Sequence, residues 1–139
     1  MKRLVTICCL VMLAGITSAH AQSAKALDPA MTELMKVKWI SNHDRGFGGG
    51  NEFYKLSKQF VKSHTPADFR RMVNHFNPVV RAMGLLCLAQ TASDESLLVL
   101  LSRSNDDAVV YLHQGCLVSK ITVGEFAKRL LIDPDFLDP

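Results

Sequence analysis

The sequence lacks the motifs that would indicate an enzyme or a metalloprotein. Segment 41–50 holds four glycines in five residues, but no Gly-Lys-Ser/Thr follows and no predicted strand precedes it, which excludes a phosphate-binding loop. Only two of the four cysteines, Cys87 and Cys116, lie beyond residue 21. No second Cys/His cluster completes the four ligands of a structural zinc site. We therefore predict no catalytic residue, no cofactor and no metal.

Long hydrophobic runs and concentrated positive charge are also missing. The apolar run from Leu4 to Ile16 is shorter than the roughly 20 residues that span a bilayer. Lys2 and Arg3 precede it and small residues ending at Ala21 follow, which is typical of a signal peptide, residues 1–21, cleaved after Ala21. We expect a periplasmic or secreted protein without a stable membrane anchor. Removing Lys2 and Arg3 lowers the formal net charge from +3 to +1, so nucleic acid is not an expected partner.

What the sequence does contain is a series of helix starts. A capping side chain precedes proline at Asp28-Pro29, Thr65-Pro66 and Asn77-Pro78, and the segment 122–125 is a capping box with Glu125 at its third helical position. Apolar residues at helical spacing follow each start. The pattern predicts one all-α domain over 22–139 with about seven helices, at 29–41, 52–63, 66–76, 78–91, 94–104, 107–120 and 123–132.

The helix predicted over 78–91 is apolar nearly all round and so must be buried on most sides. A similar sequence pattern recurs thirty residues later. Asn77, Pro78, Val80 and Arg81 correspond to Asp107, Ala108, Val110 and Tyr111, with Val79 on Val109. Cys87 lies on the first of these two helices and Cys116 on the second, and Gly84 and Gly115 take nearly equivalent positions, where glycine would let a neighbouring helix pack closely.

This repeated pattern resembles the HEAT repeat family. The resemblance implies a HEAT/armadillo-like array of antiparallel helix pairs. Residues 28–64 would form an irregular first pair containing the glycine-rich loop 41–50, residues 65–121 two helix-pair repeats, and residues 122–139 a capping helix and tail. A non-repetitive bundle of the same helices is the alternative.

The two cysteines allow two interpretations. In an oxidising compartment Cys87 and Cys116 could form a disulfide, or both could be buried free thiols. His113 precedes Cys116 by three residues, so one helix would place both on neighbouring positions. An enzyme using His113 and Cys116 is therefore an alternative, although no third group orients the histidine.

Helical arrays usually serve as binding surfaces, which implies a non-enzymatic module that binds another protein. The residues expected to contact this partner lie in the glycine-rich loop, at His43, Asp44, Arg45 and Phe47, and at acidic helix starts, at Asp94, Glu95, Asp106 and Asp107. The size, signal and helical content also resemble the small periplasmic immunity proteins of type VI secretion amidase effectors. That resemblance implies a secreted cell-wall hydrolase toxin as the partner. A structural scaffold of the envelope and a carrier of small ligands are the remaining alternatives.

Overall fold

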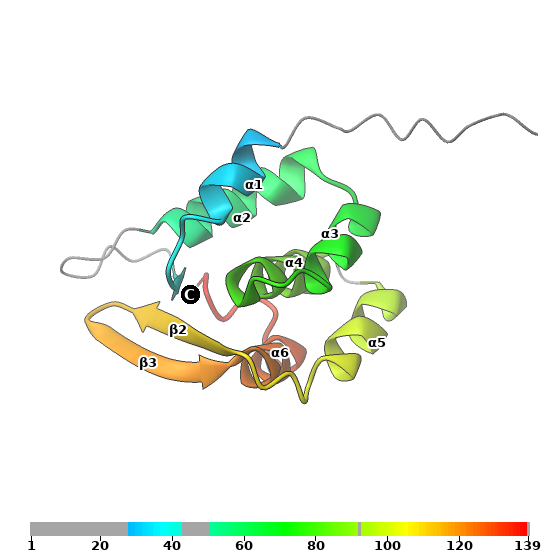
Figure 1. The fold of residues 1–139 in the computed structure, drawn as a ribbon. Helices are drawn as coiled ribbons and strands as arrows, with labels where there is room; N and C mark the ends of the chain where they lie inside the picture. Colours follow the sequence, from blue (N-terminus) through cyan, green and yellow to red (C-terminus); the bar gives the residue numbers. More distant parts are fainter. Residues whose placement is uncertain (1–27, 43–50, 92, 139) are drawn as a thin grey trace, which may run out of the picture.

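A computed structural model describes residues 28–42, 51–91 and 93–138, which form six helices and a three-stranded sheet (Figure 1). The predicted signal peptide and the loop residues His43, Asp44, Arg45 and Phe47 lie outside the described residues. None of the helices described is both long and apolar enough to cross a membrane. The elements in order are α1 (Pro29–Leu34), β1 (Ile40–Ser41), α2 (Glu52–Ser63), α3 (Pro66–Val73), α4 (Pro78–Gln90), α5 (Asp94–Ser102), β2 (Val109–Gln114), β3 (Leu117–Thr122) and α6 (Val123–Ile132).

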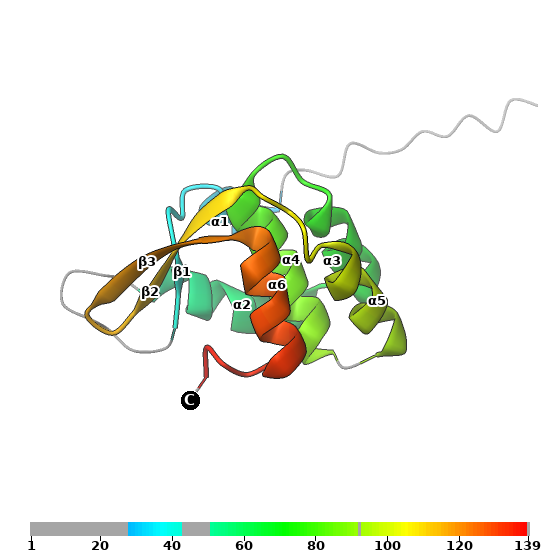
Figure 2. The same ribbon diagram turned by 90° about the horizontal axis from the view of Figure 1, so that it is seen from below.

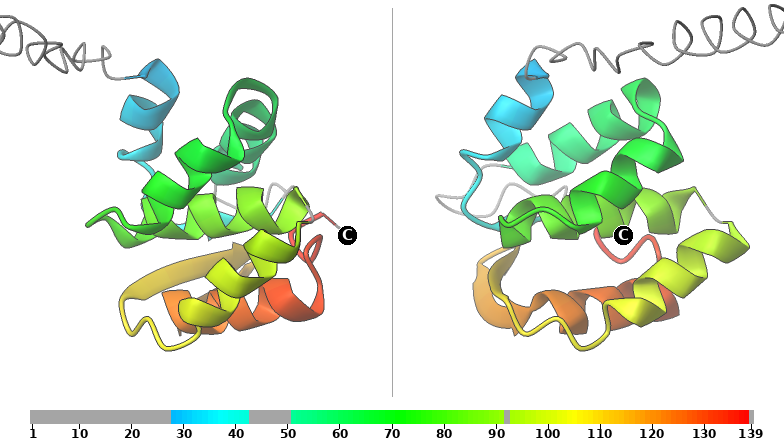
Figure 3. Two further views of the ribbon diagram at one scale, coloured as in Figure 1. Left: turned by 90° about the vertical axis from the view of Figure 1, so that its right-hand side faces the viewer. Right: turned by 45° about the vertical axis from the view of Figure 1, so that its right-hand side comes forward.

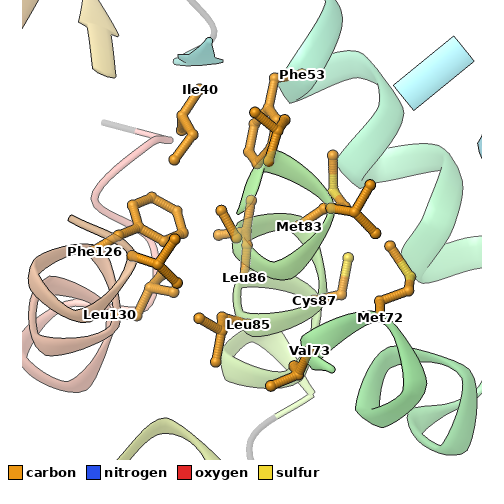
Figure 4. Packing of buried hydrophobic residues seen from close by; sticks show 14 of the residues in the cluster. Ile40, Phe53, Met72, Val73, Met83, Leu85, Leu86, Cys87, Phe126 and Leu130 are labelled. Atoms are coloured by element: carbon orange, nitrogen blue, oxygen red, sulfur yellow. The ribbon is translucent and has the colours of Figure 1, made fainter. Parts of the chain in front are cut away.

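The central element is α4, and the prediction that it is buried is confirmed. Ten of its 13 residues are buried, so it contacts neighbours on most sides. Figures 1 and 3 show α4 between the layer of α1, α2 and α3 on one side and α5, α6 and the β-hairpin on the other. In Figure 4, Leu86 lies between Phe126 of α6 and Phe53 of α2, while Cys87 faces Met72 of α3. One apolar core therefore continues through both layers.

The predicted helix starts are confirmed by their hydrogen bonds. Asp28 Oδ1 accepts the amide proton of Ala30 at 3.0 Å, and Asn77 Oδ1 accepts that of Val79 at 2.8 Å. Capping boxes open α3 and α6. At the first of them, the backbone and side-chain hydrogen bonds from Thr65 lower the pKa of Asp68 to about 2. These caps satisfy amide groups that the first helical turn leaves without an intrahelical partner.

The all-α prediction is wrong, because the segment predicted as the helix 107–120 is a β-hairpin. Strands β2 and β3 pair antiparallel from Val109↔Thr122 to Gln114↔Leu117. Gly115 and Cys116 form a two-residue turn, and Gly115 has a φ of +59°, which glycine adopts without strain. The segment is rich in Val, Ile, Thr and Tyr, the residues that favour strands. Its thirty-residue spacing from α4 does not reflect a second inner helix, so the predicted array of helix pairs is wrong as well.

The first predicted helix, 29–41, is also too long. Helix α1 ends at Leu34, and Ile40 and Ser41 form β1, which pairs parallel to β2 at Ile40↔Leu112 and Ser41↔His113. The sheet order is β1-β2-β3, so β2 is central and β3 is an edge. Ile40, Leu112 and Ile121 are buried on the face that packs against the helices.

Candidate protein-binding surface

Helix α5 leaves most of its apolar residues uncovered. Its inner side buries Ser96 and Leu100, whereas Leu97, Leu98 and Leu101 are 50, 67 and 51% exposed. Ser93 Oγ accepts the amide proton of Ser96 at 3.2 Å and fixes the start of the helix. Figure 3 shows α5 at the outer edge of the molecule, beside α6. Three leucines on one nine-residue helix therefore face solvent together.

A polar depression of about 520 Å³ adjoins the C-terminal end of α5. Phe76, which is 77% exposed, lies on it, and its ring contacts that of His75 in a tilted arrangement, with the ring centroids 4.3 Å apart. The Arg103 guanidinium donates a hydrogen bond to Asn74 Oδ1 across the same depression. Its lining residues are Asn74, His75, Phe76, Arg81, Ser102, Arg103, Asn105 and Asp106. We call Leu97, Leu98 and Leu101, together with Phe76 and Arg103, the α5 surface.

An ion pair beneath the depression holds Phe76 in place. Arg81 Nη2 donates to Asp106 Oδ1 at 3.1 Å, and Arg81 Nε lies 2.8 Å from Asp106 Oδ2 in an ionic contact that is poorly aligned for a hydrogen bond. Arg81 Nη1 also donates to the backbone carbonyls of His75 and Phe76, at 2.9 and 3.0 Å. The two side chains are only 14 and 11% exposed. Arg81 therefore connects the loop that carries Phe76 to the loop that follows α5.

The four acidic residues expected to bind a partner lie at the two ends of α5. Asp94 and Glu95 begin the helix, and Asp106 and Asp107 follow it. Glu95 forms an ion pair with Arg70, with 2.6 Å between Arg70 Nη1 and Glu95 Oε2. Asp106 is engaged by Arg81, as described above. Asp94 and Asp107 are exposed, so they are the acids of this set best placed to meet another molecule.

The apolar part of the α5 surface was not predicted from the sequence, where neither Phe76 nor the α5 leucines were among the residues expected to contact a partner. One signal could have revealed it. Helix α5 holds four leucines and Val99 in nine residues, more than one face of a short helix can bury. Phe76 carried no comparable signal, because its exposure depends on the loop that Arg81 fixes.

His113 and Cys116 do not share a helix, so the geometry behind the enzyme hypothesis does not exist. His113 is a buried residue of β2, and its ring centroid lies 6.0 Å from that of Trp39. Cys116 is exposed in the hairpin turn. Within the described ranges, no three His, Cys, Asp or Glu side chains group closely enough to hold a metal ion.

Both cysteines are free thiols in the structure, but only Cys87 is buried. Burial raises the pKa of Cys87 to about 12, which keeps its sulfur protonated and unreactive at neutral pH. Figures 1 and 2 show the hairpin turn that holds Cys116 projecting away from α4. A bridge between the two would require the hairpin to fold back and Cys87 to leave the core.

We therefore expect the two thiols to differ in reactivity. In the folded protein, iodoacetamide should modify Cys116 within minutes and leave Cys87 unmodified, and denaturation should then expose Cys87. Intact-mass analysis without reductant measures both. A mass lower by two hydrogens, with no alkylation after denaturation, would instead establish a disulfide between them.

A second depression, of about 560 Å³, lies between the segment after α1 and the start of α2. Val37, Trp39 and Leu56 form its apolar part, and three lysines and two glutamates surround them. Lys36 is already paired with Glu33 at 2.7 Å. Because the charges of this rim are mixed, we assign no ligand to it.

Comparisons with known proteins identify no relative of this chain. No protein-family model, no curated protein and no solved structure matches it. Its function is therefore argued from its own surface.

Proposed function

We propose that this protein is an exported, non-enzymatic module that binds another protein through the α5 surface. The observation that supports this most is the exposure of Leu97, Leu98 and Leu101 on one short helix, together with the exposed ring of Phe76 on the depression that adjoins the C-terminal end of that helix. Isolated exposed leucines are common, but a contiguous apolar patch rimmed by polar groups marks an interaction site. The export signal predicted in residues 1–21 would deliver the module to the periplasm or the medium.

The composition of the α5 surface matches that of a protein–protein interface. Apolar and aromatic side chains and arginine are favoured in interface centres, and charged groups form the rim. Leu98 and Leu101 are one helical turn apart and would form such a centre with Phe76. Asp94 at one end and Asp107 at the other would lie on the rim, where they influence orientation and the rate of association.

In its most specific form, the proposal makes this protein an immunity protein that neutralises a secreted cell-wall hydrolase. A rigid apolar helix that covers the substrate cleft of a toxin would block the toxin without any catalysis of its own. The fixed loop at Phe76 supports this mode, because an anchor held in place before binding loses little conformational entropy on binding. The resemblance to type VI amidase immunity proteins remains the basis for the choice of toxin class.

The test uses the purified mature protein and the product of the gene beside its own, which the immunity proposal predicts to be a secreted hydrolase. We expect Leu98→Asp and Phe76→Ala each to weaken binding by about 30-fold or more, because loss of an interface anchor costs about 2 kcal/mol or more. Isothermal titration calorimetry measures the affinity, and survival of cells that export the toxin measures protection. Both variants change exposed side chains and should keep the melting temperature of the wild type.

The matched control is Leu117→Asp, at a position that is 76% exposed on the hairpin, far from α5. We expect this variant to bind and protect like the wild type. Equal loss in all three variants would point to nonspecific apolar contact. Full protection by Leu98→Asp would reject the α5 surface, and an adjacent gene whose secreted product neither harms cells nor binds this protein would reject the immunity function.

A further inference from the structure

The outer edge of β3 is exposed along most of its length. The side chains of Leu117, Val118, Ser119 and Lys120 are all exposed, and Leu117 and Val118 are 76 and 61% exposed. No strand among the described residues pairs with this edge. Figures 1 and 2 show the hairpin extending beyond the helices, so the described helices leave most of its outer strand uncovered. An open edge strand is a template for further strand pairing.

The hydrogen-bond pattern shows which backbone groups of β3 point outward. The carbonyl of His113 accepts the amide proton of Asn42 on the β1 side at 3.3 Å, so the backbone of His113 points away from β3. Ala108, an odd number of residues before His113, has the opposite orientation and belongs to a hydrogen-bonded pair, since the amide of Val123 donates to its carbonyl at 2.8 Å. Antiparallel pairs alternate between bonded and non-bonded. Val118 is opposite His113 and so belongs to a non-bonded pair, and Lys120, two residues further along β3, has the same orientation. Both residues therefore direct their amides and carbonyls outward.

We propose that a second copy of this chain adds its β3 to this edge, antiparallel, with a two-fold axis at Ser119. This register places Val118 of each copy opposite Lys120 of the other, so all four outward groups of each strand form hydrogen bonds. A two-fold axis at Val118 would use only the groups of that residue. An axis at Lys120 would bring two ammonium groups together, which is unfavourable. The result is a continuous six-stranded sheet with an isologous interface.

Side chains agree with the same register. The outer face of the sheet would carry Val118 beside the aliphatic stem of the opposite Lys120, with the half-exposed Tyr111 in the neighbouring strand paired to Lys120. On the other face, exposed Leu117 would meet Ile121 of the second copy. The contact is short compared with stable protein–protein interfaces, so the association should be reversible and depend on concentration. It does not involve α5, so the proposed function does not depend on it.

Charge changes at Val118 test both the dimer and its register by sedimentation equilibrium at increasing concentration. Val118→Lys places two lysines opposite two lysines and should weaken dimerisation by about 2- to 30-fold, the range expected for two cross-strand pairs. Val118→Glu should strengthen it by a similar factor. The double variant Val118→Lys/Lys120→Glu should reverse the loss and dimerise about as tightly as Val118→Glu, because each lysine then meets a glutamate.

Val118 is exposed, so these variants should share the far-UV circular dichroism and melting temperature of the wild type. Leu98→Asp, on α5, should dimerise normally. A wild-type protein that stays monomeric at every concentration would overturn the proposal and make Lys120 a residue that protects the edge from pairing. A dimer that Val118→Lys and Val118→Glu affect equally would also overturn it, because the register would be different.

Discussion

Gly84→Ala should lower the free energy of unfolding by at least about 2 kcal/mol, and Gly84→Val should prevent folding, because overpacking a close contact costs about 1–3 kcal/mol and occasionally more. A Cβ atom at Gly84 would lie 2.8 Å from the Phe69 carbonyl oxygen, 2.9 Å from Met72 Cβ and 2.9 Å from the Val73 backbone nitrogen. Two of these atoms belong to the backbone of α3, so no side-chain rotation can relieve the clash. The gain of about 1 kcal/mol in helix propensity offsets only part of the cost.

Urea unfolding followed by circular dichroism measures this loss. Gly115→Asn is the matched control, because a Cβ atom at Gly115 meets nothing within 4 Å and asparagine tolerates the left-handed conformation. Its unfolding midpoint should shift little. If Gly84→Ala unfolded at the wild-type midpoint, α3 and α4 would not be in close contact at this point, and the burial of α4 would need another explanation.

The close packing at Gly84 illustrates what the sequence could predict. A helix that is apolar all round must be buried, and a small residue within it indicates where a neighbour approaches. The caps were predictable for a similar reason, since Thr65 and Asp68 form both bonds of their capping box within four residues of chain. Features whose physical causes lie within one helix, such as caps and apolar periodicity, were thus predicted correctly for α4 and for the helix starts.

The hairpin was not predicted, because part of what makes this segment a hairpin is a contact with residues far away in the sequence. Val109, Val110 and Leu112 fit a helical pattern as well as a strand pattern over so short a segment. The pairing of Leu112 with Ile40, more than 70 residues earlier, helps to fix the segment as a strand, and that contact has no signal in local periodicity. The spacing of Gly115 from Gly84 then appeared to support a repeat, although Gly115 serves a turn and Gly84 a helix contact.

The candidate binding surface shows the same difference between features with local causes and features that depend on contacts between distant residues. Acidic residues near α5 could be identified from the sequence, but their roles could not, because the ion pairs of Glu95 and Asp106 join residues 25 positions apart along the chain. The exposure of Leu98 and Phe76 also results from tertiary packing. Helix α4 supports both features, since α5 packs beside it and Arg81 extends from its first turns to the loop of Phe76.

Arg81→Met should cost about 3 kcal/mol of folding free energy, because it leaves the carboxylate of Asp106 largely buried without its cation. The change also removes the two hydrogen bonds that Arg81 donates to the carbonyls of His75 and Phe76. Asp106 would still accept the amide proton of Ala108 at 3.1 Å, so the loss should be partial and the domain should still fold in the cold. Thermal unfolding at low and high salt measures the effect, which salt should change little because the pair is buried.

A double-mutant cycle with Asp106→Asn separates the ion pair from the rest of the site. We expect Arg81→Met/Asp106→Asn to be less destabilised than the sum of the single variants, because removing both charges leaves neither one buried alone. Arg70→Met is the control, since Arg70 and Glu95 are 38 and 66% exposed and an exposed pair contributes only about 0–1 kcal/mol. Arg81→Met should also weaken partner binding at temperatures where it is folded, because Phe76 loses its support. Additive single effects, or a cost no larger than that of Arg70→Met, would show that Arg81 does not hold the two loops together.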